Sequence, residues 1–144
     1  RKSGRFSWGG AMRRFDRVIP IRLASEATPE TTVAEALIRE MGAALARYAK
    51  DRRAHVIDIS AMPLTEPDRR RLDEHLGRGE VTIEIDSLLH TRIEETCYAG
   101  VWRVRHYDSN ETVSSERIEI GDVPDIVRAQ KMDIKRSAER FLEA

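Results

Sequence analysis

The sequence predicts an α+β fold, in which an antiparallel four-strand meander packs against about three helices, with one or two short extra strands. Two observations predict it. Residues 33–49 and 127–141 repeat apolar side chains at the spacings of three and four that are typical of amphipathic helices. Residues 81–120 instead alternate apolar and polar side chains between turn residues. Strands joined by short turns pair as antiparallel neighbours, so this second stretch should form one sheet.

The start of the chain gives the weakest pattern. Residues 1–16 are basic and are interrupted by three glycines, so we expect a flexible basic arm there. Residues 17–144 are then a single domain, since a chain of 144 residues has the length of one ordinary domain. The apolar run from Val18 to Leu23 contains Pro20, which favours an edge strand or an extended segment. Because the chain begins with Arg1, we expect it to be a piece of a longer protein.

Two helices and a strand follow. The first helix should run from Thr32 to about Ala49, because Thr32 and Glu35 have the spacing of a capping box. A short strand is expected at residues 56–59. Thr65 and Asp68 form a second capping box and open a short helix that should end near Gly77. The apolar face of the first helix comprises Val33, Leu37, Met41, Ala44, Leu45 and Tyr48.

The meander should contain strands near residues 81–85, 91–98, 101–107 and 111–120. Arg103 and Arg105 share one face of the third of these strands, where acids of neighbouring strands can pair with them. After the last strand, Asp122 is the expected N-cap of the final helix. The predicted inner stripe of that helix comprises Val127, Ile134, Ala138 and Phe141.

Composition excludes several classes of protein. Basic and acidic residues number 25 each, and this neutrality argues against a nucleic-acid binder driven by bulk charge. The balance is uneven along the chain, however. Residues 1–53 hold 12 basic and 6 acidic residues, a net charge of +6, and the remainder has −6. The single cysteine excludes an internal disulfide and a cysteine-based zinc site. No apolar run approaches 18 residues, so no membrane span is predicted.

Two alternatives to a binding function remain open. A small enzyme could use Cys97, with His106 on the next strand as its base, or an acidic sheet face on which Glu84 and Glu94 oppose each other. Each group is more simply explained as an ordinary surface or packed side chain. A nucleic-acid-binding module could use the basic arm and the last helix, although Asp133 and Glu139 dilute the charge of that helix.

Three clusters in the second half resemble a known family. They are the segments from Met62 to Val81, from Glu94 to Val104 and from Ile118 to Pro124. Their order and spacing resemble the C-terminal conserved region of the HupH/HyaF family, whose members are expression and formation (maturation) proteins of nickel–iron hydrogenases. The resemblance extends from about Met62 to Asp125, and we expect it to continue to the end of the last helix, whereas residues 1–53 carry no matching motif.

The resemblance implies an accessory protein and not a catalyst. It implies a cytoplasmic chaperone that binds the precursor of the small, iron–sulfur subunit of a hydrogenase before export, alongside other hydrogenase maturation proteins. We therefore expect no catalytic residues, no metal site and no cofactor. The candidate partner-binding residues within the three clusters are Gly100, Trp102, Arg103 and Asp122. Trp102 offers a large anchor for either a core or an interface.

Overall fold

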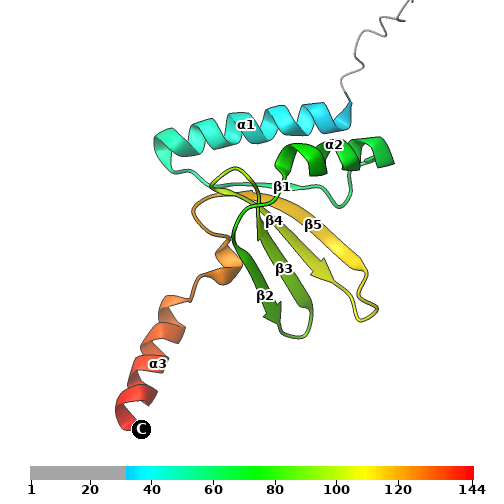
Figure 1. Cartoon of the computed structure of the whole chain (residues 1–144). Coiled ribbons are helices and arrows are strands. Elements are labelled where there is room, and N and C mark those ends of the chain that lie inside the picture. The colour runs from blue at the N-terminus through cyan, green and yellow to red at the C-terminus, as the bar shows by residue number, and fades with distance from the viewer. Residues whose placement is uncertain (1–31) are drawn as a thin grey trace, which may run out of the picture. The chain divides into compact units, whose positions relative to one another are not determined.

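The structure is a computed structural model that describes residues 32–144 (Figure 1). The predicted arm at residues 1–16, the segment at 18–23 and the domain boundary at residue 17 lie outside the described residues and stay predictions. The elements in chain order are α1 (Val33–Asp51), β1 (His55–Asp58), α2 (Glu66–Leu76), β2 (Thr82–Asp86), β3 (His90–Glu95), β4 (Val101–Tyr107), β5 (Val113–Ile120), the short 3-10 helix η1 (Asp125–Val127) and α3 (Lys131–Glu143).

The predicted α+β class and the four-strand meander are confirmed. Strands β2 to β5 pair in sequence order, and β1 adds to the free side of β5, giving the antiparallel order β1-β5-β4-β3-β2. In this register Val104 lies opposite Ile93 on one side and Arg117 on the other. Neighbouring residues of a strand point to opposite faces, so the register decides which side chains share a face.

Helices α1 and α2 cover one face of the sheet (Figure 1). Their buried side chains join those of β1, β4 and β5 in the main core. The largest fully buried side chains of this core are Leu72, Ile118 and Ile120. A second, smaller cluster of Ile93, Trp102 and Val104 belongs to the opposite face, because these residues alternate with the core-facing positions.

The two capping boxes differ from each other. At α2 the box is complete: Thr65 and Asp68 each accept a hydrogen bond from the backbone N–H of the other, at 3.3 and 3.0 Å. At α1 the box is only half formed. Thr32 Oγ1 accepts from the N–H of Glu35 at 3.2 Å, but the Glu35 carboxylate pairs with Arg71 Nε at 2.8 Å instead. A tertiary partner has therefore replaced the local one that the sequence predicted.

Asp68 caps two helices at once. Besides its contacts with Thr65, it accepts a hydrogen bond from the backbone N–H of Ala34 in the first turn of α1, at 3.2 Å. Only 6% of the residue is exposed. The hydrogen bonds from the Thr65 hydroxyl and from the N–H groups of Thr65 and Ala34 lower the pKa of Asp68 below its ordinary value.

The last helix differs from the prediction. Asp122 does not begin it, because the chain first forms the short turn η1 and then passes through Arg128 in an extended conformation. Helix α3 begins at Lys131, and none of its residues is buried, so the predicted stripe does not face a core. Amphipathic periodicity indicated the helix correctly but could not indicate what it packs against. None of the described helices is both long enough and apolar enough to cross a membrane.

Candidate functional site

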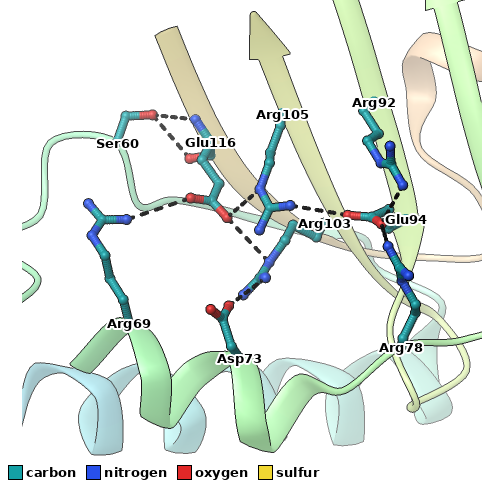
Figure 2. A network of polar contacts seen from close by, with 9 residues as sticks. All are labelled: Ser60, Arg69, Asp73, Arg78, Arg92, Glu94, Arg103, Arg105 and Glu116. Atoms are coloured by element: carbon teal, nitrogen blue, oxygen red, sulfur yellow. Dashed lines mark hydrogen bonds and ion pairs between the residues drawn. The ribbon is translucent and has the colours of Figure 1, made fainter. Parts of the chain in front are cut away.

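Charged side chains gather on the same face of the sheet as the main core (Figure 2). Strand alternation puts Arg92 and Glu94 of β3, Arg103 and Arg105 of β4, and Glu116 of β5 on this face. Glu94 lies opposite Arg103, and Arg105 lies opposite Glu116. Helix α2 and the turn after it add Arg69, Asp73 and Arg78. We call these eight residues the arginine–carboxylate network.

Glu116 is the centre of one half of the network. Its Oε1 atom lies 3.1 Å from Arg105 Nε and 3.2 Å from Arg103 Nε, and its Oε2 atom lies 3.9 Å from Arg69 Nη1. The backbone of Glu116 is held as well, since its N–H donates to Ser60 Oγ at 2.7 Å. The carboxylate is only 12% exposed, and guanidinium groups from α2 and β4 orient it.

Glu94 is the centre of the other half. It accepts hydrogen bonds from Arg78 at 2.8 Å, from Arg92 at 3.2 Å and from Arg105 at 3.1 Å. Partial burial acts to raise the pKa of Glu94, but these hydrogen bonds and the guanidinium charges outweigh it, so the pKa lies below its ordinary value. Arg92 and Arg105 oppose each other in the register, and the shared Glu94 offsets their repulsion.

The network also attaches α2 to the sheet. Asp73 on α2 accepts a hydrogen bond from Arg103 Nη1 on β4 at 2.7 Å. Arg103 is mostly covered, but its Nε atom forms no hydrogen bond and has only the ion-pair contact with Glu116. Counting Glu84, which pairs with Arg92 at 3.2 Å, the cluster has five arginines and four carboxylates, an excess of one positive charge.

Two hollows flank the network. The first, about 440 Å³, lies along Arg69, Arg105 and Glu116 and is walled by Ser60, Tyr107 and the start of β5. The second, about 350 Å³, lies beside Arg78 and Glu94. Arg69 and Arg78 remain about half and two-thirds exposed, so their guanidinium groups keep free donors. The arrangement suits the binding of acceptor groups, above all carboxylates, at a surface.

The structure separates the four candidate partner-binding residues. Gly100, Trp102 and Asp122 gather where β4 begins and β5 ends. The Gly100 carbonyl accepts from the N–H of Gly121 at 3.0 Å, and Trp102 Nε1 donates to the Gly121 carbonyl at 3.1 Å. Arg103 follows Trp102 directly and therefore points to the opposite face, into the network. The assignment of these residues to partner binding stays a prediction.

The junction around Gly121 is fixed from α1. Asp122 pairs with Arg52 Nη2 at 2.6 Å, and its backbone N–H donates to the Tyr48 hydroxyl at 3.0 Å. Gly100 has a φ of 81°, in the left-handed region that favours glycine. Trp102 is almost fully buried, so it is a packed side chain of the sheet rather than a free anchor.

The arrangement argues against both predicted enzyme sites. Cys97 follows β3, whereas His106 pairs with Thr91 at the other end of that strand, about 20 Å away along the chain direction. Glu84 and Glu94 share a face, but Arg92 lies between them and pairs with both. The lowered pKa of Glu94 is the reverse of what a general acid needs.

The sequence analysis predicted only some members of the network. It predicted that acids of neighbouring strands pair with Arg103 and Arg105, and this pairing is confirmed by Glu94 and Glu116. The contributions of Arg69 and Asp73 were missed, although their spacing of four places them on one face of α2. Within residues 32–144, no group of three or more His, Cys, Asp and Glu side chains is arranged to hold a metal ion.

With the geometry in place, comparison with known proteins identifies the family. Residues 31–144 match the model of "HupH hydrogenase expression protein, C-terminal conserved region". The chain belongs to this family. HupH of Thiobacillus denitrificans, a solved structure, is similar over 76% of this chain and 91% of that chain, with a TM-score of 0.70 and 30% identity.

Two curated relatives show how far the likeness of this HupH-family chain extends. The hydrogenase expression/formation protein HupH of Rhodobacter capsulatus is 36% identical over 110 residues, which are 76% of this chain and 40% of that protein. HupQ of Azotobacter chroococcum is 36% identical over 89 residues, 62% of this chain and 31% of that protein. The matched residues therefore cover less than half the length of each of these relatives.

Proposed function

We propose that this HupH-family chain acts in hydrogenase maturation by binding the precursor of the small, iron–sulfur subunit in the cytoplasm, before export. Family membership supports the maturation role, and the names of the relatives describe hydrogenase expression and formation. The choice of the small subunit is the one that the resemblance of the three sequence clusters implies. In this proposal the chain holds the precursor and carries out no chemical step on it.

The observation that carries the choice of surface is the arginine–carboxylate network. The mostly covered carboxylates of Glu94 and Glu116 fix the inner arginines, while Arg69 and Arg78 remain accessible at its two ends. An incoming carboxylate would meet guanidinium groups that are already oriented, so little side-chain entropy is lost on binding. The local excess of positive charge favours an acidic segment of the precursor.

The predicted residues have different roles in this proposal. Arg103 lies within the binding surface, where Asp73 and Glu116 orient its guanidinium group. Gly100 and Trp102 hold the junction at Gly121 and so fix the position of the half-exposed Asp122, which contacts α1 and lies outside the network. Truncating Trp102 would disturb packing as well as binding, so it makes a poor first test.

The test is a pull-down from cells that produce the chain together with the small- and large-subunit precursors of a hydrogenase. We expect selective retention of the small-subunit precursor. The double variant Arg69→Gln with Arg78→Gln should reduce the retained amount at least about fivefold, because it removes both accessible guanidinium groups and leaves the inner network intact.

The matched control is Arg70→Gln with Lys50→Gln, which removes the same charge from exposed positions outside the network. Equal circular dichroism spectra and melting temperatures would establish that both double variants fold. Retention of neither precursor by the unmodified chain would contradict the proposed function. Equal loss in both double variants would contradict the assignment of the surface while leaving the partner in place.

A further inference from the structure

Three ion pairs join α2 and the turn after it to the sheet, and their charges alternate along the chain (Figure 2). The charged members on the α2 side are Arg69, Asp73 and Arg78. Their partners on the strands are, in the same order, Glu116, Arg103 and Glu94, at 3.9, 2.7 and 2.8 Å. The α2 side therefore carries a positive, a negative and a positive charge, and the strand side carries the reverse.

The two sides of these pairs differ in exposure. The strand side chains are each only 12% exposed, whereas Arg69, Asp73 and Arg78 are 48%, 60% and 71% exposed. An incoming chain therefore meets the charges of the α2 side first. The complementary order of charges on that chain is negative, positive, negative.

The hollows at the network follow the same line. The hollow beside Arg69 and the hollow beside Arg78 are separated by a smaller one of about 70 Å³, which shares Arg69 with the first and Asp73 with the second. The narrow middle favours a single extended chain over a helix. Neighbouring strands lie only about 4.8 Å apart, whereas a helix with its side chains is about 10–12 Å wide.

The spacing of the exposed charges also matches an extended chain. Arg69 and Asp73 are four positions apart in α2, a rise of about 6 Å. Two residues of an extended chain span about 6.6 Å, and alternate side chains point to the same side. Arg78 lies two positions beyond the end of α2 at Leu76, and its long side chain can meet the third residue of the same series.

We infer that the segment bound by the network is extended and carries an acidic, a basic and an acidic residue at alternate positions. The two acids pair with Arg69 and Arg78, and the base pairs with Asp73. A third acid in the middle would face Asp73 and be repelled, so the network selects the order of charges and not only their sum. This inference rests on the proposed function and adds the chemistry of the segment that the precursor supplies.

The test compares short blocked peptides in a polar, uncharged background. The first has Asp, Lys and Asp at alternate positions, and the second has the same residues in the order Asp, Asp and Lys. Shifts of the backbone amide signals of residues 69–78 in nuclear magnetic resonance titrations, at about 0.01 M ionic strength, give the dissociation constants. The first peptide should bind at least about threefold more tightly, since the permutation replaces two attractions by two repulsions.

Asp73→Asn tests the middle position. It removes the charge of Asp73 but keeps an oxygen that can accept from Arg103. The difference between the two peptides should shrink at least about twofold, and a peptide with three alternate Asp residues should bind more tightly than it does to the unmodified chain. Glu74→Gln is the matched control, because Glu74 is exposed on α2 and does not belong to the network. Equal melting temperatures would establish that both variants fold.

A further peptide, with Asp, Lys and Asp at every fourth position, places the same charges on one face of a helix. Tighter binding of this peptide would overturn the extended conformation. Equal binding of the ordered and permuted peptides, or equal effects of Asp73→Asn and Glu74→Gln, would overturn the selection by charge order. Absence of any shift up to millimolar peptide would overturn the site. The pull-down of the precursor is measured separately, so the proposed function can stand while this inference fails.

Discussion

Helices α1 and α3 have similar amphipathic sequences and opposite surroundings. Helix α1 buries five side chains against the sheet and α2, and Thr32 caps its first turn. Helix α3 buries none, and no side chain caps it. The C-cap of α1 is Arg52, which takes the left-handed conformation with a φ of 58°. Its side chain pairs with Asp122.

The difference shows that the period of a sequence predicts a helix but not its partner. The apolar face of α1 meets residues that lie far along the same chain, chiefly on β5 and α2. The apolar face of α3 meets no such residues within the described chain. An amphipathic helix without an internal partner is therefore better interpreted as part of an interface than as part of a core.

Truncating one apolar side chain in each helix should give the largest difference in stability between α1 and α3. Leu37→Ala in α1 removes a side chain that is 3% exposed, and it should lower the free energy of unfolding by about 2–5 kcal/mol. Phe141→Ala in α3 should change it by less than about 0.5 kcal/mol in dilute solution. Urea denaturation at low micromolar concentration measures both. Equal losses would mean that α3 belongs to the core.

Among the contacts of α1, removing the charge of Asp68 should have the next largest effect on stability. Asp68→Asn weakens the caps of two helices, so we expect the melting temperature to fall by several degrees at neutral pH. Because the folded-state pKa of Asp68 is lowered, its contribution is present above the unfolded pKa of about 3.9 and is lost as pH falls through the folded value.

The melting temperatures of the unmodified chain and of Asp68→Asn should therefore begin to converge below about pH 5 and should converge further as the pH falls through the lowered folded-state pKa of Asp68. Thermal denaturation followed by circular dichroism at a series of pH values is the measurement. A gap that stays constant over this range would show that the charge of Asp68 makes no contribution, and that the variant acts through packing alone.

Thr32→Ala isolates the N-cap of α1. The hydroxyl oxygen accepts from the N–H of Glu35, and its loss should lower the free energy of unfolding by about 1 kcal/mol. Thr32→Ser keeps the acceptor and is the control. If Thr32→Ala has no effect, the contact between Asp68 and Ala34 is by itself enough to begin the helix.

The smallest expected effect is that of adding a side-chain N-cap to α3. Gln130→Asp places an acceptor and a negative charge at the N-terminus of the helix, and it should stabilise α3 by about 0.5–1 kcal/mol. We expect a small rise in helical ellipticity in dilute solution and slower amide exchange confined to residues 131–143. Slower exchange throughout the sheet would show that α3 and the sheet unfold together.

Much of the fold could be predicted because its determinants are local. The alternation from Thr82 to Asp86 and the capping box of Thr65 with Asp68 need only near neighbours, and both are confirmed. The start of the last helix was predicted wrongly, since Asp122 is held by Arg52 and Tyr48 of α1 instead of beginning a helix. Contacts of this kind join residues 70 or more positions apart and leave no local pattern.

The site was less predictable for the same reason. Alternation placed Arg103 and Arg105 on one face, but it could not show that Glu94 and Glu116 would each bind several guanidinium groups. Nor could it show that Arg103 and Trp102, neighbours in the sequence, serve different faces of the sheet. The register of three strands and the position of α2 decide these contacts, and both depend on residues that lie far apart in the sequence.

The double role of Asp68 also has a consequence for the order in which the chain folds. One carboxylate accepts from Thr65, the N-cap of α2, and from Ala34 in the first turn of α1, which lies 34 positions away in the sequence. The start of α2 needs only near neighbours, whereas the start of α1 also needs Asp68 of α2, so the first turn of α1 should close only once α2 has formed. The amide protons of that turn should then exchange no more slowly than those of the first turn of α2.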